Sequence, residues 1–287
     1  MKSIAAVSAS LLLSLPLPVA ARSVLDDIAE TGELRIGIQE NAIPFGYRDN
    51  NRNLLGYCIA FAELLRDDLQ DRLDSSILPL VKLVPSTVDT RFDLIRSGRI
   101  HLECGPNTIR DDLDGVTFSD PFFLTGVRLL VHEATRERVE NTDSWEGLRI
   151  GVLENTAAER MLLDLHPEAN VVIFRGSSAT AQGVSSLQGT LDGFADDEVL
   201  LLGEMVKLQL SLSEYVMVPE HPVTCELYGM ILPDDDREWS EFVNEIIHSD
   251  RADDLLVTWF QGLTDYILPT IEYCTERLAQ DSENTTR

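Results

Sequence analysis

Apolar and polar residues alternate along the chain in blocks that have the spacing of strand–helix–strand units. The apolar run at residues 34–38 predicts a strand, and the apolar positions between residues 59 and 69 recur at the three- and four-residue intervals of a helix. A second strand pattern at residues 80–85 precedes a helical pattern at residues 91–97 that Gly98 ends. Such alternation predicts a mainly parallel sheet with helices on both faces.

The same alternation starts again near residue 145. Strand patterns at residues 148–152 and 171–174 flank a helical pattern at 157–165, and a further strand ends in Asp196-Asp197 before an apolar helix. The repetition predicts two α/β lobes of similar build, connected by two chain crossings near residues 124–130 and 219–228. The predicted divisions are a first lobe of residues 22–126 and 226–261, a second lobe of residues 127–225, and an extension at 262–287.

The two ends of the chain have patterns of their own. Lys2, the apolar run at residues 4–15 and the small residues before Arg22 predict a signal peptide at residues 1–21, cleaved near Ala21. The apolar run is shorter than the roughly 20 residues that cross a bilayer, so we expect an exported, periplasmic protein. Residues 263–278 are predicted to be helical, and the residues after them to be a disordered tail.

Composition narrows the possible functions. Hydrophobic residues make up 44% of the 287 residues, which is enough for a substantial core. The net charge of -26 excludes nucleic-acid binding. The four cysteines form no CxxC pair and have no histidine at metal-ligand spacing, so neither a metal site nor a cofactor is predicted. Isolated buried thiols and a single disulfide both remain open, and the sequence does not reveal a pairing.

The segment of residues 103–110 (Glu-Cys-Gly-Pro-Asn-Thr-Ile-Arg) carries the most specific signal. It places a hydroxyl, backbone N–H groups and a guanidinium after a buried strand, and the run Val-Thr-Phe-Ser-Asp-Pro-Phe-Phe follows at residues 116–123. Such donors at the carboxyl end of a strand suit the capture of a small carboxylate. With its surroundings, the segment resembles the polar amino-acid solute-binding proteins (family 3) of bacterial ABC importers, and most closely their glutamate- and aspartate-binding members.

The resemblance, which covers roughly residues 25–260, implies a type II periplasmic-binding-protein fold. Its two lobes would close on a ligand, and a monomer would deliver an amino acid with a polar or acidic side chain to the ABC permease in the inner membrane. It also implies roles for three residues: Arg91 and Thr108 would contact the ligand, and Asp197 would bind its α-ammonium group. Asp196 would share that task or cap the following helix.

The chain departs from the family where the α-carboxylate is bound. The family places an arginine five residues after the threonine, and this chain has Leu113 there. Arg110 would take the role from two residues after Thr108, or the carboxylate is held differently, or the ligand is not an α-amino acid. The alternative for Arg110 is a surface position paired with Asp111 or Asp112.

Two further positions bear on the ligand. Thr156 matches a family threonine whose hydroxyl and helix N-terminus meet the ligand carboxylate, although Asn155 replaces the usual glycine and a plain helix cap is equally consistent. Gln39 stands where the glutamate-binding members have an arginine that reaches the side-chain carboxylate. A neutral amide suits a neutral polar side chain better than a second carboxylate, so the identity of the amino acid stays open.

Two other functions compete with transport. One is a ligand sensor that signals to a membrane partner. The other is an enzyme on the same fold, similar to cyclohexadienyl dehydratase, for which Glu103 and Asp197 are the candidate acid and base groups.

Overall fold

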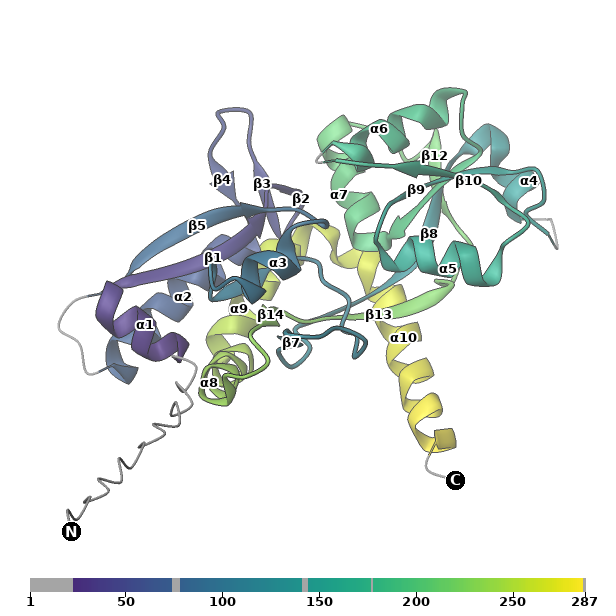
Figure 1. The fold of residues 1–287 in the computed structure, drawn as a ribbon. Helices are drawn as coiled ribbons and strands as arrows, with labels where there is room; N and C mark the ends of the chain where they lie inside the picture. The colour runs from purple at the N-terminus through teal and green to yellow at the C-terminus, as the bar shows by residue number, and fades with distance from the viewer. Residues whose placement is uncertain (1–22, 74–77, 141–143, 177, 286–287) are drawn as a thin grey trace, which may run out of the picture.

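The computed structural model describes residues 23–73, 78–140, 144–176 and 178–285. These residues form two lobes, each a sheet with helices packed on it (Figure 1). The predicted signal peptide and its cleavage site at Ala21 lie outside the described residues. None of the helices in the described part of the chain is both long enough and apolar enough to cross a membrane.

The first lobe is built on a five-stranded sheet with the order β5-β1-β6-β14-β7. Strand β1 pairs in parallel with β5 and β6, while β14 pairs in antiparallel fashion with β6 and β7. The strands are β1 (Glu33–Gln39), β5 (Leu80–Ser86), β6 (Leu102–Cys104), β7 (Thr117–Phe118) and β14 (Ile231–Leu232).

Amphipathic helices cover this sheet because their apolar positions share one face. They are α1 (Val24–Thr31), α2 (Tyr57–Arg72), α3 (Arg91–Arg96), α8 (Arg237–Ile247) and α9 (Asp250–Phe260). Ser23 caps the start of α1 through its side chain, and Gly32 ends that helix in the left-handed conformation, with φ of 67°. Trp239 and Phe45 are fully buried in the core of this lobe. A small antiparallel sheet of β2 (Asn41–Ala42), β3 (Gly46–Arg48) and β4 (Leu54–Leu55) follows β1.

The second lobe is built on a six-stranded sheet with the order β10-β9-β11-β8-β12, in which β13 also pairs with β8. Its strands are β8 (Phe123–His132), β9 (Arg149–Leu153), β10 (Asn170–Phe174), β11 (Gly193–Asp197), β12 (Tyr215–Val218) and β13 (Thr224–Tyr228). Around it lie η1 (Glu133–Thr135), α4 (Arg136–Glu140), α5 (Ala157–Leu165), α6 (Ala179–Ser185), η2 (Ser186–Gln188) and α7 (Glu198–Leu208).

The predicted two-lobe α/β fold is confirmed, and the sheets are mixed. β9 pairs in parallel with β10 and β11, whereas β8 pairs in antiparallel fashion with β11, β12 and β13. The antiparallel strands β8 and β13 run side by side between the two lobes (Figure 1). The apolar stretch at residues 228–232 does not form one strand, because β13 ends at Tyr228 and β14 begins at Ile231.

Two disulfides join all four cysteines, so the expectation of isolated thiols or a single disulfide is wrong. Cys58 at the start of α2 is bonded to Cys104 at the end of β6, and Cys225 of β13 is bonded to Cys274. The cysteines of the two disulfides are separated by 46 and 49 positions in the sequence. Local sequence patterns cannot predict contacts over such separations.

The C-terminal extension is more ordered than its composition predicts. After η3 (Gln261–Leu263), helix α10 runs from Thr264 to Thr285, past the predicted end of the helix at residue 278. Ile267, Thr270 and Cys274 are buried at helical spacing, and the exposed Arg277 donates through Nη1 to the carbonyl of Val223 at 3.1 Å. Packing on the strands between the lobes therefore supports a polar helix that local propensity leaves undecided.

Candidate ligand-binding site

A cleft between the lobes is lined by all six residues that the sequence singled out. The first lobe contributes Gln39, Arg91, Thr108 and Arg110, and the second lobe contributes Thr156 and Asp197. The amide of Asn155 in the second lobe donates to Asp89 in the first at 3.1 Å, so the two walls touch beside the cleft.

Strand ends bring the first-lobe residues together. Gln39 is the last residue of β1, Arg91 begins the helix that follows β5, and Thr108 lies in the loop after β6. Because β5, β1 and β6 are parallel neighbours, their carboxyl ends share one edge of the sheet.

Arg91 is buried, with 8% of its surface exposed. Its Nη1 donates to Asn107 Oδ1 at 2.9 Å, and its guanidinium carbon lies 5.0 Å from the centre of the Phe92 ring. Its Nε has no hydrogen-bond partner among the described residues. Burial lowers the pKa of Arg91, while the nearby charge of Glu103 opposes that shift. Arg91 is thus a cation whose orientation is fixed by Asn107 and whose Nε is available to a ligand.

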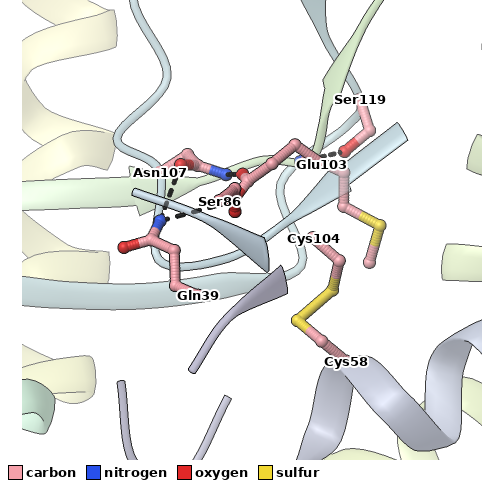
Figure 2. Close-up of a disulfide and its surroundings, with 8 residues drawn as sticks. Gln39, Cys58, Ser86, Glu103, Cys104, Asn107 and Ser119 are labelled. Atoms are coloured by element: carbon pink, nitrogen blue, oxygen red, sulfur yellow. Dashed lines mark hydrogen bonds between the residues drawn. A yellow bond between two sulfur atoms is a disulfide. The ribbon is translucent and has the colours of Figure 1, made fainter. Parts of the chain in front are cut away.

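The buried carboxylate of Glu103 supports this arginine through Asn107, and Figure 2 shows Glu103 among Gln39, Ser86 and Asn107. Glu103 is fully buried, and it accepts hydrogen bonds from Ser86 Oγ at 2.8 Å, from Gln39 Nε2 at 3.4 Å and from Asn107 Nδ2. Burial raises the pKa of Glu103, and the charge of Arg91 is the largest effect that opposes it. Glu103 thereby orients Asn107, which in turn orients Arg91.

Gln39 belongs to the same network. Its amide nitrogen also reaches Asn107 Oδ1 at 3.5 Å, so the amide donates toward the first-lobe core (Figure 2). A Cβ on Gly105 would lie 2.7 Å from that nitrogen and 2.9 Å from Glu103 Oε1, so only glycine fits there. The disulfide at Cys104 holds the strand end beside it.

Arg110 lines the cleft but already has a partner. Its Nη2 donates to Asp112 Oδ2 at 2.8 Å, and its Nε donates to the other carboxylate oxygen. This ion pair with Asp112 is the alternative to ligand binding that the sequence left open for Arg110.

Asp197 closes β11 on the opposite wall, where 7% of its surface is exposed. Tyr228 donates its hydroxyl to Oδ2, and Oδ1 has no hydrogen-bond partner among the described residues. Burial raises the pKa of Asp197 well above its usual value, and the charges of Glu226 and Asp196 add to the effect. Because it is both buried and surrounded by acids, this carboxylate favours the approach of a cation.

Asp196 lines the same cleft as Asp197 and does not cap α7. Its Oδ1 accepts from the backbone N–H of Asp197 at 2.9 Å, and its Oδ2 has no partner among the described residues. Burial and the charge of Glu204 raise its pKa to about 7. Glu204 itself is paired through Oε1 with Lys207 at 2.8 Å.

Thr156 acts as a helix cap. Its hydroxyl accepts from the backbone N–H of Glu159 at 3.2 Å and donates to the carbonyl of Leu153 at 2.7 Å. Asn155 before it has φ of 62°, a left-handed conformation that glycine and asparagine tolerate best. The replacement of the family's usual glycine by asparagine is therefore compatible with this turn.

The sequence did not single out three other charged residues in and beside the cleft. Arg160 lines it from α5, one turn after Thr156. Arg175 lines it as well and is paired with Glu154, with Nε 2.7 Å from Oε2. Glu226 of β13 lies beside Thr108 and Asp197, whose environments it affects. The four-residue spacing from Thr156 was the available signal for Arg160, whereas Glu226 needed the strand pairing.

A family model for bacterial extracellular solute-binding proteins, family 3, matches residues 34–262. The chain belongs to this family. The glutamate/aspartate import solute-binding protein of Salmonella typhimurium is 29% identical over 245 residues, which cover 84% of this chain and 79% of that protein. The L-glutamate/L-aspartate-binding protein of Pseudomonas aeruginosa is 26% identical over 231 residues, with coverages of 78% and 74%.

Solved structures confirm the fold of this family 3 protein. The ancestral amino acid-binding protein AncCDT-1 superposes with a TM-score of 0.69 at 24% identity, over 83% of this chain and 100% of that one. A mutant of the arginine-binding protein ArgBP from T. maritima gives a TM-score of 0.69 at 22% identity, with coverages of 83% and 99%. The solute receptor for L-cysteine of Neisseria gonorrhoeae gives 0.68 at 21% identity, with coverages of 83% and 92%.

Proposed function

We propose that this protein is an exported solute-binding protein that captures an amino acid between its lobes and delivers it to an ABC transporter permease. One observation carries the proposal: Arg91 and Asp197, on opposite walls of one cleft, each keep a buried polar atom without a partner among the described residues. A free amino acid presents an anionic and a cationic group close together, and it would satisfy both atoms.

The relatives support an amino acid with a polar or acidic side chain, since both are named for glutamate and aspartate. In this proposal Arg91, Thr108 and Asp197 contact the ligand, and Gln39 faces its side chain. Because the Gln39 amide nitrogen already donates to Glu103 and Asn107, no strong cation is available there for a second carboxylate. Glutamine or another neutral polar amino acid would therefore bind better than glutamate.

The expected motion follows from the connections between the lobes. We place the hinge in β8 and β13, with residues 22–126 and 226–261 moving against residues 127–225. The protein would work as a periplasmic monomer, without a cofactor. An enzymatic role is disfavoured because Glu103, one of its two candidate acid groups, is fully buried and held by neighbours. A sensor that signals to a membrane partner would capture ligand in the same way, and it stays the second candidate.

Isothermal titration calorimetry of the mature protein with each common amino acid tests the assignment. We expect saturable binding by the wild type and by the control Arg99→Gln, and strongly weakened binding by Arg91→Gln, roughly 30-fold or more. If no amino acid produces heat or a thermal shift, the amino-acid assignment is wrong. Conversion of a bound ligand into product would instead favour the enzyme.

A further inference from the structure

Arg91 offers the ligand's carboxylate one donor that has no partner among the described residues, its Nε, so a bidentate contact to that carboxylate needs a second cation. Leu113 packs among the apolar side chains around Ile95 and Ile100 in the first lobe, so it contributes no charge. Arg91 already donates to Asn107 and is held by the Glu103 network. A second guanidinium that is free to form a bidentate contact would complete the site.

Four arginines line the cleft, and their partners differ. Arg110 is bound to Asp112, Arg175 is bound to Glu154, and Arg91 is bound to Asn107. Among the described residues, none forms a side-chain hydrogen bond or an ion pair with the guanidinium of Arg160. A half-buried guanidinium with its donors available is the arrangement that a carboxylate ligand would use.

The position of Arg160 reaches both walls. It lies in the second turn of α5, four residues after Thr156 and therefore on the same side of the helix. Its positive charge lowers the pKa of Asp197 and Glu226 on one side and that of Asp112 on the other. Arg160 thus lines the same cleft as the carboxylate that we assign to the ammonium group and lies within the range of its charge.

We propose that Arg160 of the second lobe binds the α-carboxylate of the ligand, while Asp197 binds its α-ammonium group. Without ligand, the charge of Arg160 partly offsets the acidic pair of Asp197 and Glu226. With ligand, the ammonium group takes over that task, and Arg160 pairs with the carboxylate. The second lobe, which contains both Arg160 and Asp197, then binds both charged groups of the ligand. This assignment rests on the proposed function and gives Arg160 the role for which the sequence suggested Arg110.

A cycle of protein and ligand changes tests the assignment. The probes are the amino acid that the wild type binds best and the same amino acid with its α-carboxylate converted to a primary amide. We expect the wild type to prefer the acid by roughly 100-fold. Arg160→Gln should weaken binding of the acid by roughly 30-fold or more and reduce the preference to less than about 5-fold. Arg110→Gln and Arg175→Gln should retain the preference.

The outcomes separate the two proposals. A wild type that binds no amino acid overturns the proposed function itself. A wild type that binds one, together with an Arg160→Gln variant that keeps the full preference for the acid, overturns only the role of Arg160. Loss of the preference in Arg110→Gln instead would return the role to Arg110. Thermal unfolding of each variant verifies that it is folded, which we expect because these side chains lie at the cleft surface.

Discussion

The two walls of the cleft both contain buried carboxylates, but these carboxylates differ in how many of their oxygens have hydrogen-bond partners. In the first lobe, Glu103 receives three side-chain hydrogen bonds and the charge of Arg91. In the second lobe, Asp196 and Asp197 each keep an oxygen that has no partner among the described residues. The Glu103 carboxylate is therefore satisfied without ligand, whereas the carboxylates of Asp196 and Asp197 can still accept hydrogen bonds from a cation.

The difference originates in local sequence. Glu103 is followed by Gly105 and Asn107, so the chain can turn back and place donors around the carboxylate. Asp196 and Asp197 are consecutive at the end of a strand, and each carboxylate accepts one hydrogen bond, from the backbone N–H of Asp197 and from the Tyr228 hydroxyl respectively. Their neighbours are Glu226 and Glu204, which add negative charge. The first-lobe wall, with Arg91 and Glu103, which we call the arginine wall, is therefore preorganised around its carboxylate. The second-lobe wall, with Asp196 and Asp197, which we call the acidic wall, carries the carboxylate oxygens that have no partner among the described residues.

The largest effect is expected from Glu103→Gln. This change removes the charge that compensates buried Arg91, and breaking a buried ion pair from one side typically costs about 3–5 kcal/mol of unfolding free energy. Urea unfolding at neutral pH measures the loss. Glu63→Gln, which breaks a pair with Arg66 at a partly exposed site on α2, should change the stability by less than about 1 kcal/mol. Equal effects of the two variants would contradict the comparison.

On the acidic wall, removing the carboxylate charge of Asp196 should raise the unfolding stability at neutral pH, whereas removing that of Glu103 lowers it. Because the pKa of Asp196 is raised to about 7 in the folded protein from 3.8, the folded state holds a proton that the unfolded chain releases. Its contribution to stability is therefore present at pH 4 and is lost as the pH rises to 7.

Asp196→Asn should remove this loss. We expect the variant to match the wild type near pH 4 and to exceed its stability by about 1–3 kcal/mol at pH 8. Urea unfolding between pH 4 and pH 8 measures the difference. Burial lowers the pKa of His101 to about 4, so this residue makes the stability rise with pH. It does so equally in the wild type and in the variant, and its contribution therefore cancels in the difference between them. A variant that is less stable than the wild type at pH 8 would show that Asp196 is satisfied in the folded state.

Ligand affinity should also depend on pH through Asp197. The groups that face its carboxylate are Glu226 and Asp196, which raise its pKa, and Tyr228 and Arg160, which lower it. A ligand ammonium group favours the ionised form, so binding should release protons and strengthen as the pH rises from 5 to 8. Calorimetry in buffers with different ionisation enthalpies counts those protons.

The matching variant is Asp197→Asn. We expect binding about 10- to 100-fold weaker at pH 8 and little change with pH, because the amide cannot ionise. Asp234→Asn, at an exposed position far along the chain, should behave like the wild type. Affinity of the wild type that is independent of pH would mean that Asp197 is already ionised before the ligand arrives.

The strand ends were predictable from sequence, and the partners of their side chains were not. The apolar runs locate β1, β5 and β6, and the resemblance then places all six predicted residues around one cleft. The engagement of Arg110 by Asp112 depends on side-chain packing that no periodic pattern encodes. Arg160 was missed because, in the sequence alone, a cation near the start of a helix cannot be told from a solvated surface residue. The disulfides and Glu226 depend on pairing between distant strands and helices.

The smallest expected effect tests where the two walls meet. A Cβ on Gly203 of α7 would lie 2.3 Å from the carbonyl oxygen of Ile43 in the first lobe, a backbone atom that cannot easily move away. Gly203→Ala should therefore hinder the close approach of the lobes, although alanine favours the helix itself by about 1 kcal/mol. We expect unfolding stability that is equal or slightly higher and ligand binding that is a few-fold weaker.

Gly262→Ala is the matched control, because a Cβ there would meet no atom within 4 Å. Calorimetry with the preferred amino acid and thermal unfolding of the ligand-free protein separate the two contributions. Weakened binding without destabilisation would show that closure brings α7 against the loop at Ile43, so that the acidic wall moves onto the arginine wall. Destabilisation with unchanged affinity would instead show that this contact is kept whether or not ligand is bound, and the closing motion would then have to occur elsewhere along the cleft.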